Sequence, residues 1–229
     1  MQLLFVADPL ESFKTYKDSS FAMMREAVAR GHTLAACGPQ DLRWQRGQPV
    51  TAQVRQIELT GDPHDWFRTL RSGPLALHEA GAVIMRKDPP FDSEYFYATH
   101  LLGQAEREGA KVFNKPGALR DHPEKLAILE FPDFIAPTLV ARDEAAIRAF
   151  HAEHHDIILK PLDGMGGMGI FRVGADGLNL GSIVETLNRG GTQTVMVQKY
   201  LPEIVKGDKR VLVIAGQPVP FVLARIPQG

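Results

Sequence analysis

The stretch that decides the fold of the second half of this chain is Ile157-Ile-Leu-Lys-Pro-Leu-Asp-Gly-Met-Gly-Gly-Met-Gly-Ile-Phe-Arg-Val173. A lysine closes an apolar run, a cluster of glycines follows, and a second apolar run comes after them. Apolar runs on both sides of a glycine cluster predict two strands joined by a loop. Because glycine has no side chain, the loop can lay its N–H groups against phosphate oxygens, with an ammonium nearby to neutralise charge. We interpret the stretch as a nucleotide-phosphate clamp.

Other interpretations of the glycines fail on context. Gly164-Met-Gly-Gly-Met-Gly169 matches the G-x-G-x-x-G pattern of dinucleotide-binding folds, but that pattern opens a helix. Here a β-rich run, residues 170–173, and a turn follow instead. No Gly-Lys-Ser or Gly-Lys-Thr follows the glycines, and the kinase motifs His-Arg-Asp and Asp-Phe-Gly are absent from the sequence. A glycine-rich turn without a ligand remains the plain alternative.

Composition places the chain among ordinary globular proteins. Its 229 residues are 44% hydrophobic, and 26 basic against 27 acidic residues give a net charge of −1. This balance predicts no nucleic-acid partner. Cys37 is the single cysteine and lies in an apolar run, which predicts a buried structural thiol. No segment approaches a membrane span or resembles a signal peptide, so we expect no membrane partner and a cytoplasmic location.

The first part of the chain, residues 1–121, alternates strand and helix. The apolar patterns predict strands at residues 3–7, 33–36, 82–85 and 111–114 and helices from Asp18 or Ser19 to Gly31 and over residues 93–107, with a hairpin or edge strand in residues 48–60. This order is typical of an open α/β sheet, in which ligands bind beyond the carboxyl ends of the strands. Arg86 stands at one such end.

The second part, residues 122–229, is predicted to be α+β. A helix carrying Lys125 opens it, although a lone lysine on a helix is ordinarily just solvated. The expected elements after it are strands at residues 138–141, 157–160 and 194–198, helices from Asp143 and over residues 178–189, and a hairpin of residues 210–214 and 219–224.

Several polar residues of this part could act together with the glycine loop. Lys125 and Lys160 could bracket the phosphates from two sides, since each adjoins apolar structure. The turn after residue 198 could pair its backbone with an adenine edge. Asp208 and Arg210 combine a ribose acceptor with a second phosphate cation.

At this point the chain resembles a known family. Six stretches, spread from end to end, carry the resemblance: Lys17–Met23, Met85–Asp92, Asn114–Pro116, residues 158–167, Gly207–Val213 and Leu223–Gly229. They are similar to bacterial glutathione synthetases, which are ATP-grasp ligases. The resemblance implies ATP-dependent ligation of γ-glutamylcysteine to glycine through an acyl phosphate, giving glutathione, ADP and phosphate, in a homotetramer that uses Mg²⁺, with Mn²⁺ as a further possibility.

The resemblance also implies domains and roles. Residues 1–121 would form a pre-ATP-grasp, substrate-binding domain, and 122–229 an ATP-grasp region with a lid subdomain (122–200) and the start of a C-terminal subdomain (201–229). The nucleotide would be bound by Lys125, Lys160, Gly164, Met165, Gly166, Gly167, Gln198, Lys199, Tyr200, Leu201, Asp208 and Arg210. The backbone of Lys199 and Leu201 would hold adenine beside Tyr200. Arg210 and Arg225 would be catalytic, and Arg86, Asp18, Ser19 and Ser20 would bind the dipeptide.

The chain departs from the family at its end. Members continue past this point into a second glycine-rich loop and the acidic and Asn residues that hold Mg²⁺, so no metal ligand is expected in these residues, and they are expected to be inactive alone. Two other functions stay open: another ATP-grasp carboxylate–amine ligase, or an inactive nucleotide-binding fragment.

Overall fold

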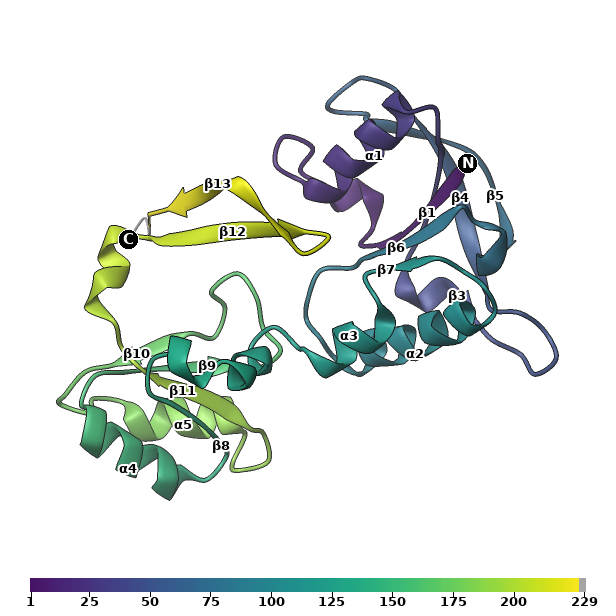
Figure 1. The fold of residues 1–229 in the computed structure, drawn as a ribbon. Helices are drawn as coiled ribbons and strands as arrows, with labels where there is room; N and C mark the ends of the chain where they lie inside the picture. The colour runs from purple at the N-terminus through teal and green to yellow at the C-terminus, as the bar shows by residue number, and fades with distance from the viewer. Residues whose placement is uncertain (227–229) are drawn as a thin grey trace. The chain divides into compact units, whose positions relative to one another are not determined.

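The computed structural model describes residues 1–226, and the chain divides into two compact units (Figure 1). The first unit contains Met1–Glu130 and the short segment Asp163–Gly166. The second contains Phe131–Leu162 and the chain from Gly167 onward. Pro227–Gly229, where one of the family-like stretches ends, lie outside the described residues.

The first unit is built on a 7-stranded sheet with the order β3-β4-β2-β1-β6-β7, in which β5 pairs with β4. Strand β1 runs parallel to β2 and β6, and β6 runs parallel to β7, whereas β4 pairs antiparallel with its neighbours. The strands are β1 Gln2–Ala7, β2 Thr33–Cys37, β3 Leu42–Arg43, β4 Thr51–Leu59, β5 Phe67–Ala76, β6 Ala82–Arg86 and β7 Val112–Phe113.

Helices cover both faces of the parallel strands. Alternate side chains of β1 point to opposite faces, so Phe5 packs in one core with helix α1 (Ser19–Ala29) and Leu4 in the other with α2 (Ser93–Arg107). The short helix α3 (Pro116–Asp121) follows β7. Because both faces are covered, ligand-binding groups of this sheet belong at its strand ends.

The second unit contains a 4-stranded antiparallel sheet with the order β10-β9-β11-β8. Helices α4 and α5 lie on the same side of it (Figure 1), and Ile147, Val184, Leu159 and Val197 are completely buried between helices and strands. The elements are β8 Thr138–Ala141, α4 Glu144–His154, β9 Ile157–Pro161, β10 Phe171–Val173, α5 Leu180–Asn188 and β11 Val195–Lys199.

The described chain ends in a separate 2-stranded hairpin of β12 (Asp208–Ile214) and β13 (Gln217–Arg225). Short 3-10 helices occur at Leu10–Ser12, Pro39–Asp41, Leu77–Glu79, Leu126–Glu130, Pro132–Phe134 and Pro202–Lys206. Within residues 1–226, no helix is long and apolar enough to cross a membrane.

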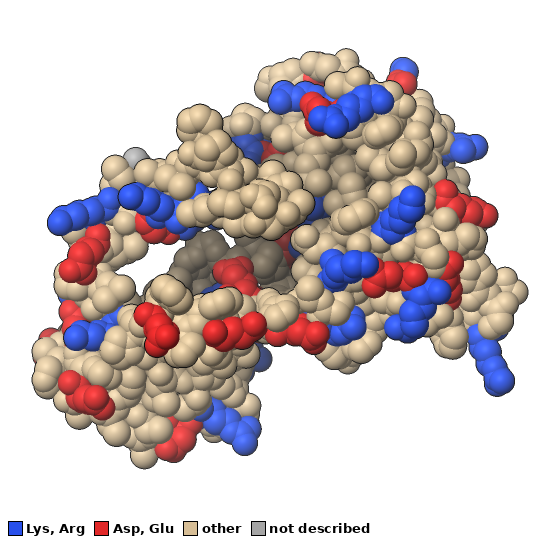
Figure 2. Space-filling view, viewed as in Figure 1, with Lys and Arg blue, Asp and Glu red and all other residues tan. Residues whose placement is uncertain are grey.

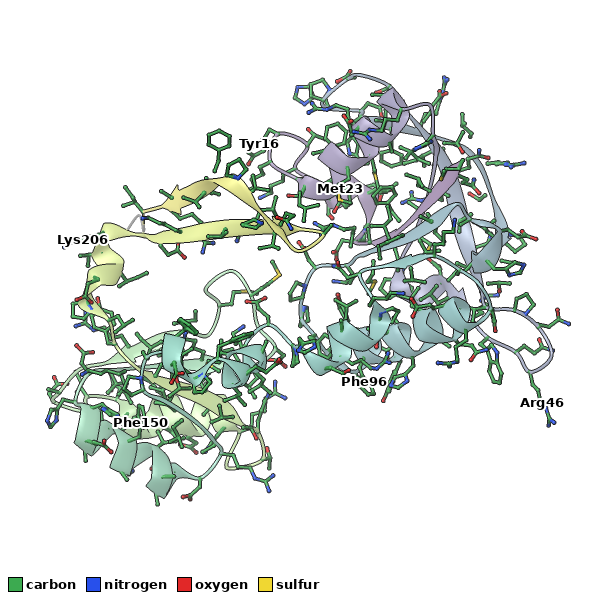
Figure 3. The ribbon with its side chains drawn as sticks, in the orientation of Figure 1. Tyr16, Met23, Arg46, Phe96, Phe150 and Lys206 are labelled. Carbon is green, nitrogen blue, oxygen red and sulfur yellow. The ribbon has the colours of Figure 1, made fainter. Side chains whose placement is uncertain are left out.

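Three predictions differ from the structure. Strand β5 was not expected, because its sequence mixes arginines with Gly73 and Pro74, as an outer strand paired to a single neighbour tolerates. Lys125 lies in a turn between α3 and a 3-10 helix and not on a helix. Phe91, Tyr95, Phe96 and Leu102 stand at near-helical spacing, which predicts a single packing face. Phe96 instead lies on the outer side of α2 (Figure 3) and is 40% exposed.

Candidate functional site

The carboxyl ends of β1 and β6 meet the start of helix α1, as the strand-end rule predicts. Arg86 ends β6 and donates a hydrogen bond from Nε to the Oγ of Ser20, at 3.0 Å. Ser20 is 5% exposed. Asp18 caps α1, its Oδ1 accepting from the N–H groups of Ser20 and Phe21 at 2.7 and 2.9 Å. The structure thus brings together Arg86, Ser20 and Asp18, and Ser19 is exposed on the first turn beside them.

Sequence reasoning missed two residues at this point of the sheet. Asp8, which directly follows β1, accepts a hydrogen bond from the N–H of Asp88 and pairs with Lys87, both at 2.8 Å. Tyr95 is partly buried, and this burial raises the pKa of its phenol, while the charge of Arg86 acts to lower it. Asp8 could have been found, because it follows a strand end just as Arg86 does.

The loop from Lys87 to Phe91 contains a cis peptide bond between Pro89 and Pro90. Acidic and basic side chains are interspersed over the face of the first unit drawn in Figure 2. The residues at the strand ends, Arg86 with Ser20 and Asp8 with Lys87, are therefore distinguished by their hydrogen bond and ion pair, because no surface patch of a single charge surrounds them.

Lys125 is held by the tip of the glycine loop. Its ammonium donates a hydrogen bond to the carbonyl oxygen of Gly164, and its side chain is only 14% exposed. The nearest carboxylate, on Glu124, lies 3.9 Å away. The alternative of a merely solvated helix lysine is wrong, because the side chain is largely buried and bonded to the loop.

The glycine loop joins two antiparallel strands, β9 and β10, so the prediction of a glycine-rich hairpin is confirmed, as is the rejection of a helix after Gly169. Gly166, Gly167 and Gly169 have φ values of 65°, 82° and 70°, which side chains rarely adopt. A Cβ on Gly169 would also lie 3.2 Å from the Cγ of Pro161. The last glycine is thus required by backbone geometry and close packing alone.

The face of the 4-stranded sheet away from α4 and α5 carries a row of polar side chains. Lys160 on β9 donates a hydrogen bond to the side-chain oxygen of Gln198 on β11. The amide nitrogen of Gln198 in turn donates to the Oγ1 of Thr138 on β8, at 2.9 Å. All three side chains are partly exposed. This hydrogen-bonded row, which we call the polar face, crosses the sheet and presents a cation and an amide to any ligand on that side.

The turn after β11 is fixed to the neighbouring strands through its backbone. The N–H of Lys199 donates to the carbonyl of Pro137 at 2.9 Å, and that of Tyr200 to the carbonyl of Asp156 at 2.8 Å. The carbonyl of Leu201 accepts from Ile204 at 3.1 Å, at the start of the next 3-10 helix. The turn is therefore ordered, but the prediction that Lys199 and Leu201 hold adenine stays a prediction.

The terminal hairpin pairs two of the predicted residues with each other. Asp208 and Arg225 face one another across β12 and β13, and Arg225 donates two hydrogen bonds to the Asp208 carboxylate, the first at 2.8 Å from Nε. These bonds lower the pKa of Asp208, and Arg210 lowers it further. Gly207 is needed before them, since a Cβ there would lie 2.3 Å from the Arg225 carbonyl oxygen. The catalytic roles of Arg210 and Arg225 stay predictions.

The described residues hold no cluster of metal-binding side chains. Among residues 1–226, no group of three or more His, Cys, Asp and Glu side chains is placed to hold a metal ion. The described residues therefore offer no preformed set of three such ligands for a divalent cation.

Models of known families match nearly the whole chain. Residues 1–120 match the N-terminal domain of prokaryotic glutathione synthetase, and residues 124–229 match its ATP-grasp domain. The glutathione synthetase of Ralstonia nicotianae is 58% identical over 229 residues, which cover 100% of this chain and 70% of the relative. That of Neisseria meningitidis serogroup B is 55% identical, with 100% and 73% covered.

Solved structures agree on the fold. An ATP-grasp RimK domain protein from Sphaerobacter thermophilus superposes with a TM-score of 0.59 at 21% identity, covering 93% of this chain and 69% of its own. The D-cycloserine synthetase DcsG gives a TM-score of 0.58 at 18% identity, covering 91% and 62%. The expected α/β architecture, an N-terminal domain followed by an ATP-grasp domain, is confirmed. The chain belongs to the prokaryotic glutathione synthetase family.

Proposed function

We propose that the chain is the ATP-dependent ligase that joins γ-glutamylcysteine to glycine through an acyl phosphate, releasing glutathione, ADP and phosphate. Relatives named glutathione synthetase, at up to 58% identity over the whole chain, support this assignment. The observation in the structure that carries it is the polar face, where Lys160 and Gln198 form a hydrogen-bonded row on the side of the sheet opposite α4 and α5. Such a face can receive a nucleotide.

The nucleotide would be bound by the polar face, the glycine loop and the turn after β11. Lys160 and Lys125 would neutralise phosphate charge, and the N–H groups of residues 164–167 would donate to phosphate oxygens. The backbone of Lys199 and Leu201 would pair with the adenine edge. Phosphoryl transfer needs positioned positive charge and no covalent chemistry from the protein, which agrees with these residue types.

The dipeptide would be bound at the strand ends of the first unit. Arg86 would hold a substrate carboxylate, since a guanidinium offers paired donors to the two oxygens of that group. Ser20 keeps Arg86 oriented, and Asp18 caps the helix that carries Ser20. Arg210 and Arg225 would stabilise the charge that develops on the acyl phosphate, with the Asp208 pairing of Arg225 exchanged for the ligand.

Three further features belong to the proposal. Mg²⁺, or Mn²⁺ in its place, would accompany ATP. The protein would assemble as a homotetramer, which light scattering on the purified chain would test. It would act in the cytoplasm, which fractionation of the source cells would test.

The decisive experiment measures ADP release with ATP and Mg²⁺, with γ-glutamylcysteine and glycine added separately and together. Release that requires both substrates, and glutathione detected by mass spectrometry, would support the ligase. Release with another amine but not with glycine would assign a different carboxylate–amine ligase. ADP binding without any release would reduce the 229 residues to a nucleotide-binding module.

A further inference from the structure

A second polar group lies on the same side of the 4-stranded sheet as the polar face. Arg172 on β10 stands opposite Ile158 on β9, and Gln198 on β11 stands opposite the same residue from the other side. Directly opposed residues of antiparallel strands point to one face, so Arg172 and Gln198 share it. Tyr200, two residues beyond Gln198, follows the same alternation.

Arg172 contacts the ring that is expected beside adenine. Its guanidinium carbon lies 3.8 Å from the centroid of the Tyr200 ring, well within the range of a cation–π contact. A phenol ring has two faces, and the guanidinium covers one of them. Tyr200 is only partly buried, so its ring can still offer surface to a flat partner.

Asp156 fixes both members of this contact. Its carboxylate accepts two hydrogen bonds from Arg172, at 3.0 and 2.6 Å, and its carbonyl accepts the N–H of Tyr200 at 2.8 Å. The bonds from Arg172 lower the pKa of Asp156, so the carboxylate stays charged at neutral pH. Two parallel bonds hold the planar guanidinium in one orientation, which lysine could not reproduce. The ring of Tyr200 is thereby held in place before a ligand arrives.

We propose that Arg172 is a positioning residue for the purine base: together with Asp156 it fixes the ring of Tyr200, against which the base stacks. This inference rests on the proposed nucleotide function of the face. A ring that is already ordered loses less conformational entropy when a base stacks on it, so the contribution appears in the affinity for base-containing ligands alone.

The test is calorimetric titration of the chain with ADP and, separately, with inorganic tripolyphosphate, which has no base. Arg172→Ala is expected to weaken ADP binding about three- to tenfold, the size of an exposed cation–π contact with its ion pair. Tripolyphosphate affinity should change less than about twofold. In a Tyr200→Ala background, Arg172→Ala should change ADP affinity by less than about twofold, because the arginine acts through the ring.

The matched control is Arg148→Ala, which removes an arginine of similar exposure from an ion pair with Glu144 on α4, on the helical side of the unit. It should leave ADP affinity unchanged. Equal losses for ADP and tripolyphosphate, or an undiminished Arg172→Ala effect without Tyr200, would overturn the inference. If the wild type binds ADP, and Lys160→Met weakens this binding while Arg172→Ala does not, the positioning role of Arg172 is wrong but the nucleotide site stands. If the wild type binds neither ligand, the nucleotide assignment fails with it.

Discussion

The two units place their candidate ligand-binding residues in different positions on a sheet. In the first unit, Arg86 and Asp8 stand at the ends of parallel strands whose two faces are covered by α1 and α2. In the second unit, Lys160, Gln198 and Arg172 stand on the face of an antiparallel sheet whose other face is covered by α4 and α5.

The difference follows from how the strands are connected. Parallel strands need crossover helices, and these cover both faces, so polar groups can reach a ligand only at strand ends. Antiparallel strands can leave one face open, and polar side chains can then occupy it in a row across several strands. The chain therefore places ligand-binding candidates both at strand ends and on an open sheet face. For each arrangement, different mutations are expected to damage folding and to damage binding.

The largest effect is expected from adjacent residues of β9 that point to opposite faces. Leu159 is completely buried under the helices, and Ile158 is partly exposed on the open face. Leu159→Ala should cost about 2–5 kcal/mol of unfolding free energy through the cavity it leaves. Ile158→Ala should cost clearly less but should weaken ADP binding. Native-state hydrogen exchange of the β9 and β11 amides measures the first quantity, and calorimetry the second.

Equal losses of unfolding free energy in Leu159→Ala and Ile158→Ala would contradict the proposed difference between the two faces of β9. The difference would also be contradicted if, with the unit folded, ADP binding were weakened by Leu159→Ala and unchanged by Ile158→Ala.

The next effect concerns the polar face itself. Lys160→Met keeps the length of the side chain and removes the ammonium, so ADP affinity should fall roughly 10- to 100-fold, the value of a charge-assisted hydrogen bond of about 1.5–3 kcal/mol. Stability should change by less than about 1 kcal/mol, because Gln198 keeps its bond to Thr138. Unchanged ADP affinity would remove Lys160 from the nucleotide site. Arg148→Ala serves as the control.

The sequence predicts features that are determined locally, and it misses features that depend on the pairing of strands. Helix 93–107 was predicted at its observed position, and Asp18 was one of the two residues predicted to cap α1, because local periodicity and capping chemistry determine both features. Strand β5 was missed, since pairing with β4 and not its own pattern makes it a strand. Arg172 was missed as a site residue because only the register of β10 against β9 brings it beside Tyr200.

Mutation of Arg86 tests whether the strand ends of the first unit bind the dipeptide. Arg86→Ala should raise the dissociation constant of γ-glutamylcysteine about tenfold, as loss of a charge-assisted contact worth about 1.5 kcal/mol would, while ADP affinity stays within about twofold. Arg55→Ala, which removes an ion pair with Glu11 in the same unit, is the control and should change neither constant. An effect of Arg86→Ala confined to ADP would move this residue to the nucleotide site and would erase the distinction between strand ends and open face.

The smallest effects are expected at Asp18, where two substitutions distinguish its contribution to stability from its contribution to dipeptide binding. Asp18 caps α1, so Asp18→Ala should cost about 1 kcal/mol, whereas Asp18→Asn keeps the capping oxygen and should retain stability. Trp66, whose ring lies 5.1 Å from that of Phe21 on α1, reports this unfolding by fluorescence in urea. If the carboxylate also binds the dipeptide, Asp18→Asn should weaken γ-glutamylcysteine binding about two- to fivefold, as an exposed charge pair would. Wild-type affinity in Asp18→Asn would leave Asp18 as a cap alone, and the strand-end site would then depend on Arg86 and the residues that hold it.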